Sequence, residues 1–205
     1  MKSTIFLATV ILALFSGTNT SAALFEMDSD FGPDTITFDS ETGFEWLDLT
    51  LTLGLSVLEV EAQLPVGGEY FGWRYATSAE IETLFYTSAD LPANEYATLE
   101  DAPKYLEMQR LFGITIDGVV PGCYLCMRMT AGFNATYTQP DWRQVSQIMV
   151  EWYSTGTVRD MFSAVAGGNG IVSSGNQITG HWLMRDPGAV GVEESTWGTL
   201  KALYR

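Results

Sequence analysis

The chain contains few basic residues. Its 205 residues include 10 lysines and arginines against 25 aspartates and glutamates, for a net charge of −15. Binding to nucleic acid requires a basic surface that neutralises phosphates, so we expect no nucleic acid partner. An acidic surface is typical of a protein that stays soluble outside the cytoplasm, and specific cation binding is the alternative interpretation.

Long apolar runs are lacking after the N-terminus. The run from Ile5 to Phe15 follows Lys2 and precedes small residues that end at Ala22 and Ala23. It is shorter than the roughly 20 apolar residues of a transmembrane helix. These features predict a signal peptide over residues 1–23, with an uncleaved anchor as the alternative. We therefore expect a secreted or periplasmic protein, not membrane-spanning after cleavage, with a single domain over residues 24–205.

The common catalytic motifs are absent from the sequence. No serine lies in a nucleophile-elbow pattern, and Gly167-Gly168-Asn169-Gly170 lacks the lysine of a phosphate-binding loop and predicts a turn. The sole histidine, His181, lies on a predicted strand, where a packed or surface role is more common than a role as a base. We expect a protein without catalytic activity.

Only two cysteines are present, Cys123 and Cys126. In an exported chain an even count favours a structural disulfide between them. A redox-active pair and a metal-related pair are the alternatives. The redox interpretation lacks the helix N-terminus that lowers a thiol pKa, and two cysteines with His181 fall short of the four ligands of a structural zinc site.

Local signals are densest between Asp39 and Phe85. A polar turn ending at Gly43 joins two β-prone runs, Thr35–Phe38 and Phe44–Leu47, which predicts a hairpin. Capping-box spacings, Ser56 with Glu59 and Thr77 with Glu80, predict the starts of two helices. The expected helices are Ser56–Leu64, Ser78–Tyr86 and Leu99–Phe112, the last between the cap Thr98 and the stop Gly113.

In the second half of the chain, apolar and polar residues alternate with a period of two, and glycines separate the alternating segments. Its expected strands are Ile114–Ile116, Tyr124–Thr130, Val145–Trp152, Val158–Val165 and Gln177–Met184, and Leu24–Met27 is an expected edge strand. Helices early and strands late predict an α+β class, with two to three N-terminal helices packed on antiparallel sheets.

A wider motif spans this region and the C-terminal end. It consists of Asp39, Gly43, Trp46, Asp48, Trp73, Arg74, Thr77 and Glu80, followed by Gly180–Asp186 near the C-terminus. The pattern resembles secreted bacterial proteins that often carry a Pro-Glu-Pro sorting tag. It is distantly similar to the C-terminal domain of collagen-like adhesins and to formylglycine-generating enzymes.

The resemblance implies a C-type-lectin-like fold for residues 24–205 and an adhesin-like or matrix role. The formylglycine-generating family also implies an alternative, a copper-dependent thiol oxidase using Cys123 and Cys126, and a subunit of an extracellular assembly is a further alternative. For Asp39, Asp48 and Arg74 we expect a network of buried ion pairs or turn contacts, because the forked donors of arginine suit a carboxylate or loop carbonyls.

The candidate ligand-binding residues are aromatic. Trp142, Trp152 and Trp182 lie in the half of the chain where related folds place ligand-facing loops, and exposed aromatic rings stack on sugars or peptides. The expected partner is an extracellular glycan or protein, and self-association is an alternative. No cofactor is expected. Calcium binding by the aspartates between Asp28 and Asp34 is a weaker hypothesis, since the spacing only partly matches a calcium loop.

Overall fold

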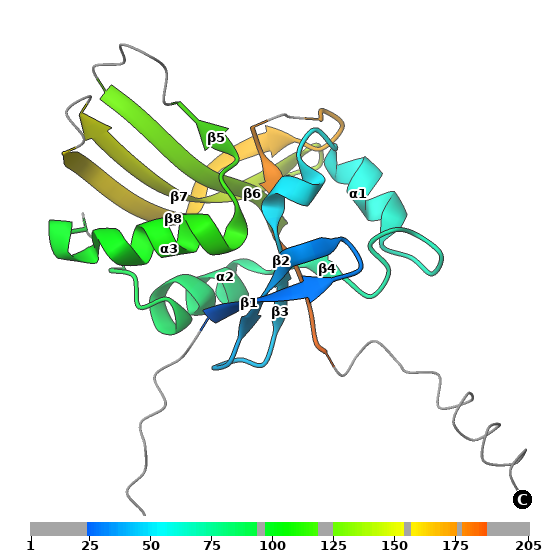
Figure 1. The fold of residues 1–205 in the computed structure, drawn as a ribbon. Helices are drawn as coiled ribbons and strands as arrows, with labels where there is room; N and C mark the ends of the chain where they lie inside the picture. Colours follow the sequence, from blue (N-terminus) through cyan, green and yellow to red (C-terminus); the bar gives the residue numbers. More distant parts are fainter. Residues whose placement is uncertain (1–23, 94–96, 119–124, 154–156, 176–177, 188–205) are drawn as a thin grey trace, which may run out of the picture.

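The computed structural model describes residues 24–93, 97–118, 125–153, 157–175 and 178–187, and these form two sheets with helices between and beside them (Figure 1). Sheet A contains, in spatial order, β1 (Leu24–Ser29), β2 (Gly32–Asp39), β3 (Glu45–Leu47), β10 (Leu183–Arg185) and β4 (Arg74–Tyr75). Sheet B contains β5 (Ile116–Asp117), β6 (Leu125–Gln139), β7 (Trp142–Tyr153) and β8 (Val158–Ile171), and β9 (Gly180–His181) pairs with β6. All pairings are antiparallel except that of β6 with β9.

The helices begin where their capping residues predict. α1 (Val57–Gln63) and α2 (Ser78–Thr83) both start with a complete capping box, at Ser56 and Thr77. α2 continues as a π-helical turn η2 (Leu84–Ser88), and α3 (Ala102–Phe112) follows a 3-10 turn η3 (Leu99–Asp101). Gly113 ends α3 with φ of 80°, a conformation that glycine adopts without strain. A further 3-10 helix, η1 (Leu49–Thr52), follows β3.

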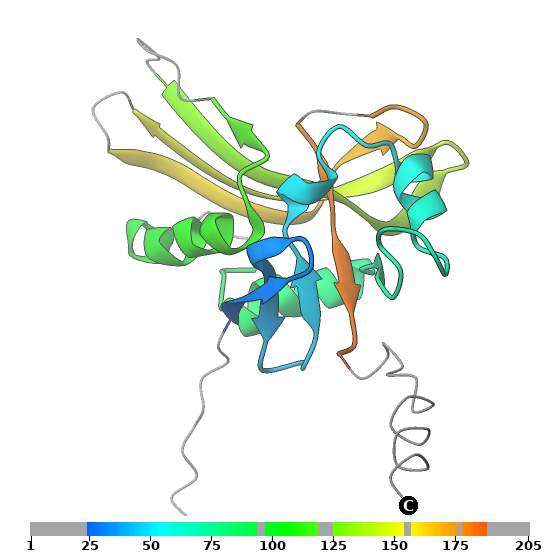
Figure 2. The ribbon, with the colours of Figure 1, turned by 45° about the vertical axis from the view of Figure 1, so that its right-hand side comes forward.

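The main core lies between the two sheets. It joins Trp46 and Met184 of sheet A to Ile148 and Val150 of sheet B through the apolar faces of α2, η2 and α3. Figures 1 and 2 show α2 and α3 on the same side of sheet B. A second cluster packs α1 against the other face of sheet A and against Phe133 of β6. α1 and the pair α2 and α3 are therefore bound to different apolar surfaces.

The last described strands join the two sheets. β10 lies between β3 and β4, so a strand from the C-terminal end of the chain completes a sheet that begins at Leu24. In Figure 2 the orange strand runs beside the blue N-terminal ones. Between β9 and β10, Trp182 donates its backbone N–H to the Phe133 carbonyl of sheet B and accepts from the Ala76 N–H. One residue thus links sheet B to the segment that follows β4.

The predicted α+β class is confirmed, and so is the hairpin of β2 and β3, in which Ile36 pairs with Leu47. The prediction of a turn at Gly167–Gly170 is wrong, because these residues continue β8 to Ile171. The register with β7 shifts here, between the pairs Val145–Gly168 and Gln147–Ala164. A bulge absorbs extra residues within a strand and favours glycine, so the glycines bend the strand without ending it.

Among the described residues, no helix has the length and apolar character needed to cross a membrane.

Candidate functional site

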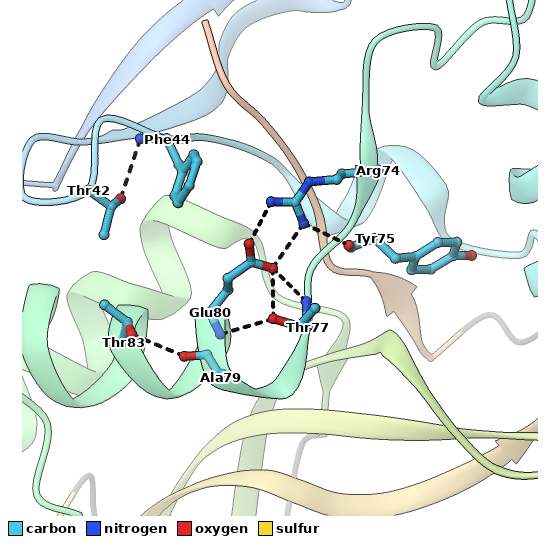
Figure 3. Close-up of polar contacts among 8 residues, drawn as sticks. All are labelled: Thr42, Phe44, Arg74, Tyr75, Thr77, Ala79, Glu80 and Thr83. Carbon is cyan, nitrogen blue, oxygen red and sulfur yellow. Dashed lines mark hydrogen bonds and ion pairs between the residues drawn. The ribbon is translucent and has the colours of Figure 1, made fainter. Parts of the chain in front are cut away.

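The motif residue Arg74 makes an ion pair with Glu80 at the start of α2 (Figure 3). Its two terminal nitrogens donate to the two carboxylate oxygens at 2.9 and 2.5 Å, and one of them also donates to the Tyr75 carbonyl. The same carboxylate accepts from the backbone N–H and the hydroxyl of Thr77, both at 2.8 Å. Arg74 therefore holds a carboxylate and a loop carbonyl together, as its forked donors predict.

Electrostatics favour the ionised form of Glu80. Burial alone would raise its pKa, but the hydrogen bonds from Arg74 and Thr77 outweigh burial and lower the pKa to about 2. The guanidinium is half-exposed at 49% and contacts water, so the pair stabilises the fold by roughly 1 kcal/mol rather than by the full value of that shift. Its role is to fix the junction of β4 and α2.

The other motif residues form separate local structures rather than one network. Asp39 is fully buried; it accepts from the backbone N–H of Glu41 and the hydroxyls of Thr42 and Ser88. It thereby fixes the β2–β3 turn, where Gly43 has φ of 76°, and ties the turn to η2.

Asp48 and the motif tryptophans are structural as well. The Asp48 carboxylate caps η1 by accepting from the N–H and hydroxyl of Thr50, both at 2.7 Å. Trp46 is buried in the main core. Trp73 is also buried, and the guanidinium of Arg185 lies 4.5 Å from its ring centroid. The expected turn contacts and an ion pair of Arg74 are present, but they do not join the three residues: each of them stabilises a different turn or helix start.

The candidate tryptophans occupy different environments. Trp182 has 0% exposure, its ring packs against Phe85 and Phe112, and its indole N–H donates to the Ser146 carbonyl. The hypothesis that Trp182 faces a ligand is therefore wrong, because no part of its ring is accessible. Trp152 is partly buried against the main core, with Arg128 over its ring at 5.3 Å. Trp142 remains, with 38% of its surface exposed.

His181 is a packed residue, as expected for a lone histidine on a strand, and it has specific partners. Its Nε2 lies 3.0 Å from the Leu55 carbonyl oxygen, which can only accept, so Nε2 carries the proton. Nδ1 then accepts from the Tyr75 hydroxyl at 2.7 Å. Burial, the larger cause, and nearby Arg143 lower the His181 pKa to about 4. The imidazole is neutral at pH 7 and connects β9, β4 and the loop before α1.

Arg143 is the partner that sequence analysis missed. Its guanidinium lies 3.6 Å from the ring centroid of Tyr75 and 4.8 Å from that of Tyr137, and it donates to Glu61 of α1 at 3.0 Å. Tyr137 donates its hydroxyl to the same Glu61 oxygen. Only 5% of the arginine side chain is exposed. Arg143 and its carboxylate partner Glu61 are 82 positions apart in the chain, and no local motif predicts such a contact.

The end of sheet B beside α1 carries a group of exposed apolar side chains. Trp142 pairs with Ile171, which is 43% exposed. Tyr137 is 47% exposed and pairs with Arg143, the residue after Trp142, so the two rings point to opposite sides of this end of the sheet. Leu58 of α1 is 50% exposed, and its N–H donates to the carbonyl of Val172, the residue after Ile171. We call these four residues, Leu58, Tyr137, Trp142 and Ile171, the aromatic end of sheet B. Of the three candidate tryptophans, only Trp142 belongs to it.

The structure describes only one of the two cysteines. Cys126 lies on β6 and is buried. Cys123 lies outside the described residues, so the disulfide, the redox pair and the copper oxidase all stay predictions.

The proposed calcium loop forms the turn of the β1–β2 hairpin. There the Asp28 carboxylate accepts from the Asp34 N–H at 3.1 Å. Within the described ranges no group of three or more histidine, cysteine, aspartate or glutamate side chains could hold a metal ion. Calcium binding stays a prediction.

One shallow pocket of about 280 Å³ lies between β1, η2 and α3, lined in part by Leu24, Ser88 and Met108. Its charged rim residues are already paired, Lys104 with Asp90 and Glu107 with Arg110. The pocket therefore offers little polar recognition.

Comparisons with known proteins do not assign the chain: no family model, no curated protein and no solved structure matches it.

Proposed function

We propose that this chain is an exported, non-catalytic binding protein with a C-type-lectin-like fold, which captures an extracellular glycan or protein at the aromatic end of sheet B. The sequence resemblance and the insertion of β10 between β3 and β4, which brings the two chain ends into one sheet, support the fold. The observation that carries the function is the exposure of Trp142 and Tyr137 on a rigid support.

The support is rigid because both residues lie on paired strands, and the Tyr137 ring is anchored as well. Tyr137 is fixed by its hydrogen bond to Glu61 and by the guanidinium of Arg143. Trp142 is a strand residue whose partner in the register is Ile171. Anchored aromatic rings lose little conformational entropy when a ligand binds. The arrangement resembles a preformed recognition surface more than a solvated loop.

The chemistry of the surface suits a ligand with both apolar and hydroxylated faces. Aromatic rings stack on the apolar face of a sugar ring, while the Glu61 carboxylate, 35% exposed, accepts hydrogen bonds from hydroxyl groups. The net charge of −15 disfavours strongly anionic ligands. A neutral glycan is therefore the preferred ligand class, and an extended peptide is the second.

A glycan array with the purified mature protein tests the proposal, followed by calorimetry on the best neutral glycan. Trp142→Ala and Tyr137→Ala should each weaken binding by roughly tenfold, as for a central aromatic contact. Phe25→Ala is the matched control, because Phe25 is 44% exposed on sheet A and should leave affinity unchanged. Binding that tolerates both variants of the aromatic end would overturn the assignment of the surface.

A second candidate, a subunit of an extracellular assembly, is favoured by β8. This 14-residue strand is at the edge of sheet B, and Ala166 to Asn169 are exposed. The Met161 carbonyl of β8 already accepts from the Ala97 N–H, and backbone groups that stay unpaired along a strand edge can pair with another chain. Sedimentation over a wide concentration range tests association. Gly168→Lys places a charge where a side chain meets nothing within 4 Å, so it should abolish an edge-mediated assembly without disturbing the fold.

A further inference from the structure

Three methionines gather on one face of sheet B. Met127 and Met129 are two residues apart on β6 and therefore point to the same side. Met149 of β7 is the register partner of Met129. We call these three residues the methionine cluster. Met149 also pairs with Phe162 of β8, so the cluster is continued across the sheet by an aromatic ring.

The cluster faces away from the main core. The alternate residues of the same strands, Ile148 and Val150, belong to the core that α2 and α3 cover. Met127, Met129 and Met149 are therefore on the opposite face. Among the described residues, neither core cluster includes any of the three. They are not buried by the packing that explains the other apolar strand residues.

The cluster is nevertheless sheltered. Met149 is only 9% exposed, and Met127, Met129 and Phe162 are half-buried. Ala131 and Phe133 continue the same face of β6 and are buried, and Ile116 of β5 is a register partner of Met129. The methionines therefore lie at the partly exposed end of an apolar face, where an ion from solvent can reach them.

The spacing suits a single ion. Residues paired across two strands have Cβ atoms about 5 Å apart, and diagonal neighbours are about 7–8 Å apart, within reach of long side chains. Met129 and Met149 are such a pair, and Met127 and Met149 are such a diagonal. Because a flexible methionine side chain places its sulfur two bonds beyond Cβ, the three sulfur atoms can converge above the sheet.

The neighbouring charges favour a cation. Glu151 pairs with Met127 in the register and with Asp160 on the other side. Glu151 is 19% exposed and is neutralised in part by Arg159, 3.3 Å away. The two carboxylates of Glu151 and Asp160 outnumber the one guanidinium of Arg159. This part of the sheet therefore has a net negative charge, which attracts a positive ion.

We propose that the methionine cluster binds one Cu(I) ion through its three thioether sulfur atoms. Thioethers are soft ligands that select Cu(I) over the hard cations Mg²⁺ and Ca²⁺. The site is separate from the cysteines and from the aromatic end of sheet B. A test of copper binding is therefore independent of the proposed glycan binding. It also differs in ligand type from a site built of histidine, cysteine and carboxylate groups, of which no cluster of three or more lies among the described residues.

An anaerobic competition titration with a coloured Cu(I) chelator tests the site on the purified mature protein. The expected stoichiometry is one ion per chain. Met127→Leu, Met129→Leu and Met149→Leu conserve volume and should each lower affinity by roughly tenfold or more, since losing a ligand costs at least as much as losing a residue that only orients one. Met108→Leu and Met161→Leu, both buried in the main core, are matched controls and should bind normally.

A second measurement identifies the ligands without any variant. With ¹³C-labelled methionine methyl groups, one equivalent of Ag(I), a soft monovalent analogue, should shift the three cluster signals and leave those of Met108 and Met161 in place. Cu(I) binding that survives loss of the whole cluster but disappears in Cys123→Ser would overturn the proposal, because the ion would then be bound by thiol. Absence of binding by the folded protein would overturn it as well.

Discussion

His181 makes the stability of this protein depend on pH near pH 6, where no other type of side chain titrates with its ordinary pKa. The chain has a single histidine, and burial is the main cause that lowers its pKa from 6.5 to about 4. In the unfolded chain the imidazole takes up a proton near pH 6.5, whereas in the folded protein it stays neutral to about pH 4. Stability is therefore complete above pH 6.5 and declines as the pH falls.

The expected loss follows from the two pKa values. The excess of protons bound by the unfolded state rises from about a quarter at pH 7 to about 0.9 at pH 5, so the free energy of unfolding should fall by about 2 kcal/mol over this range. The decline should end near pH 4, where folded His181 also takes up a proton. Glu80 has a folded pKa of about 2 and an unfolded pKa of 4.5, so its contribution to stability is lost as the pH falls from about 4.5 to about 2.

Urea unfolding at pH 7.0, 6.0 and 5.0 measures this directly. For wild type the midpoint should fall by about 1 M over this range, given an m-value of about 2 kcal/mol/M. His181→Gln should be less stable at pH 7, because the glutamine amide cannot reproduce the two hydrogen bonds of the imidazole to Tyr75 and Leu55. Its free energy of unfolding should be constant between pH 7 and pH 5. Tyr75→Phe is the matched control, since it removes the hydroxyl and keeps the histidine, and should retain the slope.

A wild-type protein whose stability is constant between pH 7 and pH 5 would refute this reasoning, and so would a His181→Gln variant with an unchanged slope. The first result would mean that folded His181 titrates at its ordinary pKa. The second would assign the pH dependence to another group.

Three further perturbations have defined outcomes. Arg74→Gln should cost about 1 kcal/mol, and NMR titration should show the Glu80 pKa rising toward 4.5, because the strongest donor is lost. Gly132→Ala should cost about 1–3 kcal/mol in thermal or urea unfolding, because the added Cβ would lie 2.9 Å from the Trp182 ring. Asp39→Ala should cost at least about 2 kcal/mol, since several donors lose their acceptor in a buried turn; a smaller loss than 0.5 kcal/mol would show that water replaces the carboxylate.

Local structure was predictable because its signals lie within a few residues of each other. The capping boxes at Ser56 and Thr77 are three-residue patterns, and both form as expected. Arg74 was expected to hold a carboxylate or a carbonyl, and it holds both within six residues of itself.

Long-range contacts were not predictable from the same signals. The burial of Trp182 depends on the helices of the main core, and the partners of His181 are 106 and 126 positions away. Period-two patterning also does not say which face of a strand is inward when both faces carry apolar residues. For this reason the sequence suggested Trp182 as a ligand contact, and it gave no indication that Arg143 lies between two tyrosines.

The position of β10 determines when this protein can finish folding. A ribosome releases the chain from its N-terminus at roughly 5–20 residues per second, and β3 and β4 are made early. The strand that separates them, Leu183–Arg185, is made more than 100 residues later. Until it arrives, sheet A lacks the strand that joins β3 to β4, and Trp46 lacks the indole of Trp182 against which it packs. A contact between segments so far apart in the chain slows folding. Until it forms the nascent chain stays incompletely folded, and an incompletely folded polypeptide can still pass through a narrow channel.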